Sequence, residues 1–274
     1  MTLLGTITNP ENAHVRYVRA LYKKRARYRD KRYVLEGLRL VGHALDAGHR
    51  PALAFYTDAF ASGPGEALVH ALHAGDTPTW RTTPAVMERL ADTVTPQGIV
   101  AVMPLPEPPP LSPDADLLLV LDALRDPGNL GTILRTAQAT QVDAVLLTPG
   151  SADPYAPKVV RAGMGAHLSL ALYPDTPWSD VLRLTAGTRR VLAEADAPHT
   201  LWEWDWTAPT TLIVGSEAHG AGQEARAAAD ARLRLPMAAE TESLNASIAT
   251  AVFLFEARRQ RGARWERGPQ WQAL

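Results

Sequence analysis

Short apolar runs alternate with amphipathic stretches along the whole chain, which is the pattern of an α/β protein. In the first part of the chain, the predicted strands are 33–37, 52–56 and 98–103, and the predicted helices are 12–29, 37–48, 64–74 and 84–91. In the second part, the predicted strands are 116–121, 143–147, 190–194, 211–214 and 232–235, and the predicted helices are 128–140, 156–165, 177–186 and 243–260. Apolar strands separated by helices predict a parallel sheet that is covered on both faces.

A proline-rich segment interrupts this alternation at 104–114, where six of eleven residues are proline. Proline removes a backbone donor and keeps the chain extended, so neither a helix nor a central strand is expected there. The sequence therefore predicts a small α/β domain over 1–106, a linker over 107–114 and a second, parallel-sheet domain over 115–274.

The composition narrows the class of protein. Hydrophobic residues make up 46% and charged residues 21% of the 274 positions, which is ordinary for a globular chain that buries a core. Cysteine is absent, which excludes disulfides, thiolate metal sites and thiol nucleophiles. No apolar run is long enough for a membrane span, and the first residues lack the features of a secretory signal. We expect a cytoplasmic protein with no membrane contact, and the scattered histidines predict no metal site.

Basic residues gather in one stretch, although the net charge is only −1. Between positions 16 and 32 the sole acid is Asp30. Such a cluster is typical of phosphate binding and predicts a nucleic-acid contact, while a solvated helix face is the alternative. The predicted RNA-binding residues are Arg16, Arg19, Lys23, Lys24, Arg25, Arg27, Arg29, Lys31 and Arg32.

Common nucleotide-binding and hydrolase motifs are missing. The loop after 116–121 has no G-x-G-x-x-G, which disfavours a dinucleotide-dependent dehydrogenase. The glycines of 215–222 are not followed by Lys-Ser/Thr, so no P-loop is expected, and no G-x-S-x-G is present.

Three polar loops follow apolar strands instead, and the first two of them contain glycine. They carry N-L-G-x-x-x-R from Asn129 to Arg135, G-S-E-A-H-G from 215, and P-M-x-x-x-x-E-S-L-N-A-S from 236. Taken singly, Asn129 or Ser243 could be a plain helix N-cap, and Arg135 or Glu217 an ordinary surface charge.

Together, in this order, the three motifs resemble those of the SpoU (TrmH-type) branch of the SPOUT RNA 2′-O-ribose methyltransferases. Segment 151–170 is similar to the family's stretch between its first two motifs. Segments 9–45 and 93–102 resemble its N-terminal, ribosomal-protein-like RNA-binding domain. The resemblance covers nearly the whole chain.

The resemblance implies a C-terminal parallel-sheet domain with a deep trefoil knot, S-adenosylmethionine as cofactor, and a homodimer. Unaided sequence reasoning would reject a knot, because knots are rare. The cofactor-binding residues it implies are Thr148, Pro149, Gly150, Gly215, Leu235, Met237, Leu244 and Asn245.

The catalytic residues that the resemblance implies are Asn129, Arg135, Glu217, Ser243 and Asn245. Arg135 is the family's proposed proton acceptor, but a guanidinium is effectively always charged, so an orienting and charge-stabilising role is expected instead. The expected activity is methyl transfer to a ribose 2′-oxygen of ribosomal RNA, because the N-terminal domain is more typical of rRNA-directed members. The alternatives are a tRNA methyltransferase and a non-catalytic RNA-binding protein.

Overall fold

The computed structural model describes residues 3–217, 219–238 and 244–262. By contacts between residues, the chain divides into two compact units. The first holds the chain up to Pro110 together with Arg125–Arg135 and Ala152–Pro174. The second holds Leu111–Leu124, Thr136–Ser151 and the chain from Asp175 onward. The main division thus falls in the proline-rich segment, and residues from the predicted domain 115–274 contribute to both units.

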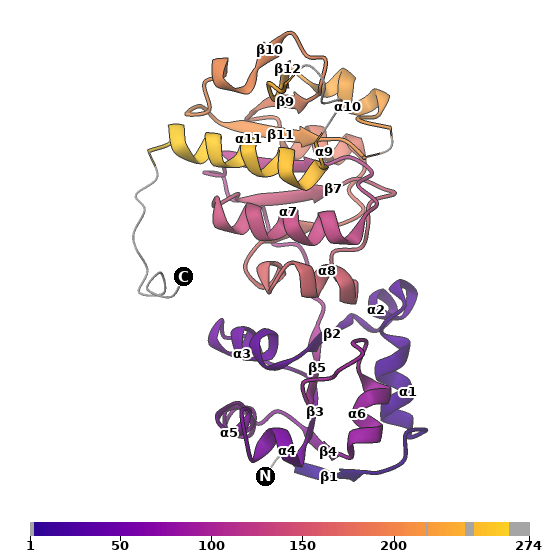
Figure 1. Ribbon diagram of the computed structural model, residues 1–274. Coiled ribbons are helices and arrows are strands. Elements are labelled where there is room, and N and C mark those ends of the chain that lie inside the picture. The colour runs from indigo at the N-terminus through magenta and orange to yellow at the C-terminus, as the bar shows by residue number, and fades with distance from the viewer. Residues whose placement is uncertain (1–2, 218, 239–243, 263–274) are drawn as a thin grey trace. The chain divides into compact units, whose positions relative to one another are not determined.

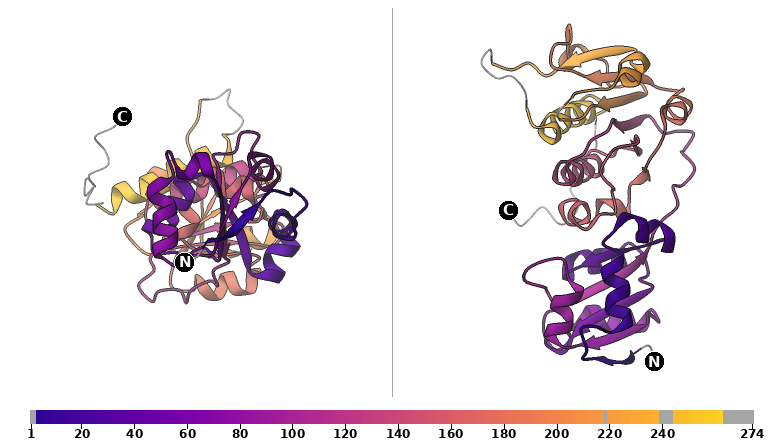
Figure 2. Two further views of the ribbon diagram at one scale, coloured as in Figure 1. Left: turned by 90° about the horizontal axis from the view of Figure 1, so that it is seen from below. Right: turned by 90° about the vertical axis from the view of Figure 1, so that its right-hand side faces the viewer.

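The first unit is built on a sheet with the strand order β1-β4-β3-β5-β2, in which β1, β4 and β3 are parallel and β5 is antiparallel to both of its neighbours. Helices α3 and α5 lie on one face of this sheet and α1 and α6 on the other (Figures 1 and 2). The strands are β1 (Leu3–Ile7), β2 (Arg32–Glu36), β3 (Leu53–Thr57), β4 (Thr79–Thr82) and β5 (Ile99–Pro104). The helices are α1 (Ala13–Ala20), α2 (Lys24–Asp30), α3 (Leu38–Asp46), α4 (Asp58–Ala61), α5 (Glu66–Ala74) and α6 (Pro84–Leu90), and this unit also holds α8 (Pro157–Ala162), η1 (Ala166–Leu168) and β8 (Ala171–Tyr173).

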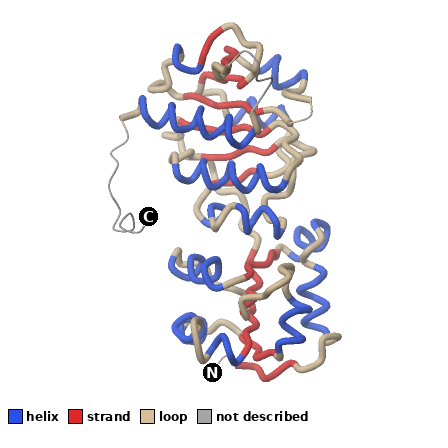
Figure 3. Tube along the Cα trace, in the orientation of Figure 1, coloured by secondary structure: helices blue, strands red, loops and turns tan. Residues whose placement is uncertain are grey.

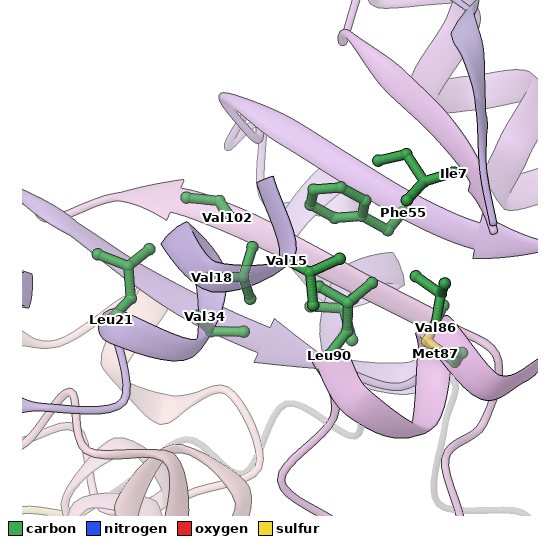
Figure 4. Packing of buried hydrophobic residues seen from close by; sticks show 11 residues of the cluster. Ile7, Val15, Val18, Leu21, Val34, Phe55, Val86, Met87, Leu90 and Val102 are labelled. Atoms are coloured by element: carbon green, nitrogen blue, oxygen red, sulfur yellow. The ribbon is translucent and has the colours of Figure 1, made fainter. Parts of the chain in front are cut away.

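A core between α1, α6 and the sheet fixes the position of the basic segment. Val15, Val18 and Leu21 are fully buried and pack with side chains of α6 and the strands (Figure 4). Burying such a side chain contributes about 1.5–3 kcal/mol relative to leaving it exposed. The cluster comprises Ile7, Val15, Val18, Leu21, Val34, Phe55, Val86, Met87, Leu90, Val100 and Val102.

The single helix predicted over 12–29 is wrong, because the structure has two helices there, α1 and α2. Lys23 between them is extended, with φ −99° and ψ 131°. The break follows Leu21 and Tyr22, which are held against α6: Leu21 is buried in the core and the Tyr22 hydroxyl donates to the Leu90 carbonyl at 2.7 Å. Tertiary contacts therefore override a helical periodicity that continues through the break.

In the second unit the strands lie in the order β10-β12-β9-β11-β6-β7, all parallel. Helix α11 lies along one face of this sheet (Figure 1), and Figure 3 shows helices alternating with the strands. The strands are β6 (Leu117–Leu121), β7 (Ala144–Leu147), β9 (Arg189–Ala193), β10 (His199–Thr200), β11 (Thr210–Val214) and β12 (Ala231–Arg234). The helices are α9 (Trp178–Leu184), η2 (Leu201–Glu203), α10 (Gln223–Ala228) and α11 (Ala246–Gln260), while α7 (Pro127–Ala139) runs from one unit into the other.

The register of the parallel strands brings their carboxyl ends to one edge. Val214 of β11 pairs with Leu121 of β6, and Leu121 pairs with Leu147 of β7. The loops that follow these three strands therefore begin side by side. Among the described helices, none is long and apolar enough to cross a membrane.

All eight predicted strands are present within one or two residues at each end. The elements that the sequence missed are short or lie at sheet edges, where few apolar residues mark them. They are β1, β4, β8, β10, α4, α10, η1 and η2.

Candidate active site and RNA-binding surface

A buried carboxylate ties together the loops at the carboxyl edge of the sheet in the second unit. Asp122, directly after β6, accepts hydrogen bonds from Thr148 Oγ1 at 3.0 Å, Trp178 Nε1 at 3.2 Å and the Gly222 backbone N–H at 2.7 Å. Thr148 Oγ1 also accepts from the Ala123 N–H at 2.9 Å. The structure thereby brings together two of the predicted cofactor loops, 148–150 and the loop that begins at Gly215.

The Gly215 loop doubles back on itself. Ser216 and Gly220 exchange two backbone hydrogen bonds of 2.9 Å. A Cβ at Gly215 would lie 2.3 Å from the backbone nitrogen of Ala221, a distance that real Cβ atoms essentially never show. Only glycine fits here, because the loop's own backbone occupies the space that a side chain would need.

The predicted cofactor-binding residues differ in how far their side chains are buried. The Thr148 side chain is buried and engaged with Asp122, so it supports its loop from within, whereas Pro149 and Gly150 are exposed. Gly150 has φ +89°, which favours glycine. Leu235 and Met237, after β12, are half-buried, and Leu244 is exposed before α11. These loops offer backbone polar groups and apolar side chains.

Asn129 and Arg135 lie on α7, six residues apart. The N-cap role considered for Asn129 is wrong, because its own backbone N–H donates to Asp126 Oδ1 at 2.7 Å, inside the first turn of the helix. Arg135 is exposed and makes no ion pair with any residue that the structure describes. A Cβ at Gly131 would lie 2.4 Å from the Ala162 Cβ, so this glycine allows α7 and α8 to pack closely.

The residues of the other two motifs lie in the second unit. Glu217 is exposed in the loop after β11. Asn245 is the N-cap of α11: its Oδ1 accepts from the N–H groups of Ser247 at 2.9 Å and Ile248 at 3.4 Å. Ser243 lies outside the described residues.

The basic segment lines a cavity of about 530 Å³ in the first unit. Arg16, Lys23 and Arg25 have no ion-pair or hydrogen-bond partner among the described side chains. Arg19 is tethered, because its Nη1 donates to the Ala91 carbonyl at 2.9 Å. The basic residues that line the cavity are Arg16, Arg19, Lys23, Arg25 and Arg29, together with Arg89 of α6.

The prediction that Arg27 contacts RNA is wrong, because its side chain is 3% exposed. Its Nε and Nη2 donate to Asp153 Oδ2 at 3.0 and 2.5 Å, and its Nη1 donates to the Leu21 carbonyl at 2.8 Å. Every part of the guanidinium is therefore occupied inside the first unit.

Two further residues of the basic segment have acidic partners at the surface. Arg29 pairs with Asp30, and its hydrogen bonds lower the pKa of that carboxyl; Lys31 does the same for Glu107. Exposed ion pairs of this kind contribute little to stability and break easily, so the side chains of Arg29 and Lys31 can still bind phosphate.

Sequence reasoning missed Asp122 and Arg89. Asp122 directly follows a fully apolar strand, which is a signal that a buried acid could be present, whereas nothing in the local sequence of α6 connects Arg89 with residues 16–29. In the part of the chain that the structure describes, no group of three or more His, Asp or Glu side chains could hold a metal ion.

Comparison with known proteins gives matches over both parts of the chain. The SpoU rRNA Methylase family matches residues 116–255, and the MRM3-like substrate binding domain matches residues 12–101. An uncharacterized tRNA/rRNA methyltransferase of Synechocystis sp. is 36% identical over 266 residues, which cover 95% of this chain and 96% of the relative. The 23S rRNA guanosine 2′-O-methyltransferase of Bacillus subtilis is 35% identical over 62% of this chain and 68% of its own length. The crystal structure of an AdoMet-bound rRNA methyltransferase from Sinorhizobium meliloti superposes with a TM-score of 0.84 at 30% identity, over 94% of this chain and 98% of that one.

Proposed function

The chain belongs to the SpoU rRNA methylase family, and we propose that it transfers a methyl group from S-adenosylmethionine to a ribose 2′-oxygen of ribosomal RNA. The observation that carries the proposal is the family match over 116–255, which contains all three motif loops. The mouse rRNA methyltransferase 3, mitochondrial, is 30% identical over 92% of this chain, which favours rRNA as the substrate.

The loops at the carboxyl edge of the sheet fit the proposed cofactor. Half-buried Leu235 and Met237 offer an apolar surface for adenine, and the backbone of exposed Gly150 and half-buried Gly215 offers polar groups for its edge. S-adenosylmethionine supplies, when bound, a methyl group on a sulfonium. The chain's own residues then have to align the ribose and stabilise charge on its 2′-oxygen.

We assign those tasks to the motif residues. Arg135 is exposed and unpaired within the described chain, so its planar guanidinium is free to hold the ribose and an adjacent phosphate and to stabilise a developing alkoxide. Asn129 lies six residues, or about 1.7 turns, earlier on the same helix, and we assign it to the same nucleotide because family membership implies it as a catalytic residue. Family membership implies Glu217, Ser243 and Asn245 as further catalytic residues.

Replacing Arg135 by Ala tests this assignment. We expect methyl transfer to fall at least 100-fold, roughly the effect of losing one preorganised charge-stabilising donor, while cofactor binding persists. Arg135→Lys should not restore transfer, because a point charge cannot reproduce a planar fork. Arg183→Ala removes an exposed arginine of α9 that pairs only with Asp180 of its own helix among the described residues; it is the control and should keep full activity. Single-turnover transfer by Arg135→Lys near the wild-type rate would contradict the bidentate role.

The cavity lined by Arg16, Lys23, Arg25 and Arg89 is proposed to hold RNA phosphates. Each phosphate contact contributes about −0.7 to −0.9 to the log–log salt slope of RNA affinity. Replacing Arg16, Lys23 and Arg25 by Gln should therefore flatten the slope by roughly two to three, for matched and scrambled RNAs alike. The control replaces three other basic residues of the first unit, Arg39, Arg50 and Arg81. An unchanged slope in the cavity variant would support a merely solvated face.

Mapping of ribose methylation in the RNA of a deletion strain shows whether the substrate is ribosomal RNA or transfer RNA. A mark lost from rRNA supports the proposal, and a mark lost only from tRNA supports the runner-up. A non-catalytic RNA-binding protein predicts no lost mark, and it is disfavoured because Asn129, Arg135, Glu217, Ser243 and Asn245 are all present.

We also propose the trefoil knot and the homodimer that family membership implies. The dimer is supported by apolar side chains along α11 that stay exposed, with Ile248 at 54% and Phe255 at 43%. Phe253 of the same helix is buried and lies edge-on to Trp206, so it is not part of this exposed surface. Light scattering should give twice the chain mass for the wild type and one chain mass for Ile248→Glu. A wild-type monomer at micromolar concentration would overturn the dimer.

A further inference from the structure

Asp122 stands out because it is an acid at 6% exposure that none of the motif roles uses. Its two oxygens serve different segments of the second unit. Oδ1 accepts from Thr148 Oγ1 and Trp178 Nε1, and Oδ2 accepts from the Gly222 N–H. Hydrogen bonds to an ionised carboxylate are roughly twice as strong as neutral ones, so this group is suited to hold segments that are far apart in sequence.

We infer that Asp122 is a positioning residue for the cofactor, because it sets the spacing between the loop at 148–150 and the loop at 215–222. The inference rests on the proposed function, which places S-adenosylmethionine against these two loops. Asp122 has its own place in the sheet through its backbone, whose N–H donates to the Val214 carbonyl at 2.8 Å. Its side chain then fixes both loops relative to the sheet.

Each loop is held at a defined point. Thr148 Oγ1 donates to Asp122 and accepts from the Ala123 N–H, so the first residue of its loop is bound from two sides. Gly222 closes the other loop and is the N-cap of α10, with φ −69° and ψ 171°. A Cβ at Gly222 would lie 3.1 Å from Asp122 Oδ2, which is tighter than nine in ten real contacts. A methyl group at position 222 would therefore push the carboxylate away by a few tenths of an ångström.

An amide cannot replace this carboxylate. The Trp178 indole and the Gly222 backbone N–H can only donate, and they face different oxygens of Asp122. An Asn side chain has one oxygen, so one of these donors would always face an NH₂ group. Asp122→Asn keeps the volume and shape of the side chain but releases one of the two attachments.

Asp143 provides a matched control on the same strand pair. It precedes β7, and its Oδ2 accepts from the backbone N–H groups of Asp116 and Leu117 at 2.9 Å each, at the amino end of β6. Both bonds go to one oxygen, which an amide would keep, so the control is Asp143→Ala: it removes a carboxylate that receives backbone hydrogen bonds, but at the edge of the sheet opposite to the cofactor loops.

The test is calorimetric titration of the full-length protein with S-adenosylmethionine, together with thermal unfolding in its absence. We expect Asp122→Asn to raise the Kd at least tenfold, and Asp143→Ala to keep it within twofold even where both variants lose similar thermal stability. A merely structural role for Asp122 would lower the melting temperature and leave the Kd of the folded protein unchanged. A Kd for Asp122→Asn within threefold of the wild-type value would overturn the inference.

Gly222→Ala acts on the same contact from the other side. It should also raise the Kd, and the double variant with Asp122→Asn should bind no more than about threefold more weakly than the poorer single variant, since both break one attachment. If the two substitutions raised the Kd by fully multiplicative factors, or if Gly222→Ala kept the wild-type Kd, they would not act through one shared contact between Asp122 and Gly222. If Asp122→Asn does not fold, Gly222→Ala and Trp178→Phe decide the question by the same limits. A wild-type protein that binds no S-adenosylmethionine would instead overturn the proposed function.

Discussion

Breaking the buried ion pair between Arg27 and Asp153 on one side should be among the most destabilising single substitutions in the first unit. The two side chains are 3% and 6% exposed. Asp153 Oδ1 accepts further hydrogen bonds from the Tyr28 hydroxyl at 3.1 Å and the Tyr155 N–H at 3.0 Å. Asp153→Ala would leave the guanidinium buried without its counter-charge. Removing one partner of a buried pair typically costs about 3–5 kcal/mol, a large share of a total stability of about 5–15 kcal/mol.

Urea unfolding followed by circular dichroism measures this loss, and hydrogen exchange over residues 13–30 localises it to α1 and α2. The double variant Arg27→Met with Asp153→Asn should recover most of the stability, because it removes both charges and keeps an acceptor for the Tyr155 N–H. Arg29→Ala breaks an exposed pair with Asp30 and should cost no more than about 1 kcal/mol. A loss below about 1 kcal/mol in Asp153→Ala would refute the reasoning.

Three further outcomes are expected. Gly215→Ala should weaken S-adenosylmethionine binding more than tenfold by calorimetry, because its methyl group would meet loop backbone at 2.3 Å and the loop has to shift; wild-type affinity would contradict this. Burial, with His43 and His49 nearby, lowers the pKa of His167 to about 3, against about 6.5 in an unfolded chain. Below about pH 6.5 the unfolded state therefore binds one proton more than the folded state. The free energy of unfolding should then fall by up to about 1.4 kcal/mol for each pH unit as the pH drops below about 6.5. His167→Phe should reduce this slope in urea titrations from about pH 7 to pH 5, and equal slopes in the two proteins would argue against it. Binding of S-adenosylmethionine should be unaffected by a chelator, since no described residue cluster could hold a metal ion.

The central strands β6, β7 and β11 of the second unit were predictable because each contains a continuous apolar run. Leu117–Leu121 and Thr210–Val214 are buried at every position, so the sequence carries no alternation and indicates a sheet covered on both faces. Short edge elements such as His199–Thr200 carry no such run, since only part of an edge strand is buried. Local patterns therefore locate the middle of a sheet better than its borders.

Local sequence patterns also fail to show which cations of the basic segment are buried. Counting charges identifies 16–32 as unusual, but it cannot separate Arg27, which is buried, from Arg25, which lines the cavity. The difference depends on Asp153, which lies 126 positions away. Arg89 joins the cavity for a similar reason, because contacts between α1 and α6 bring it there. Which cations face solvent is decided by packing between distant segments.

Buried acids offer one way to extend such predictions. Asp122 follows an apolar strand directly, and its partner Gly222 is 100 positions away. Asp153 lies in a turn rich in apolar and small residues and pairs across 126 positions. A carboxylate in an apolar surrounding has to find donors, because burying it unpaired is far too costly. Each acid that a sequence places beside a core strand or turn is thus a predicted meeting point of distant segments, although the sequence alone does not identify the donors. In this protein one such acid fixes the helix of the basic segment, and the other fixes the loops that we assign to the cofactor.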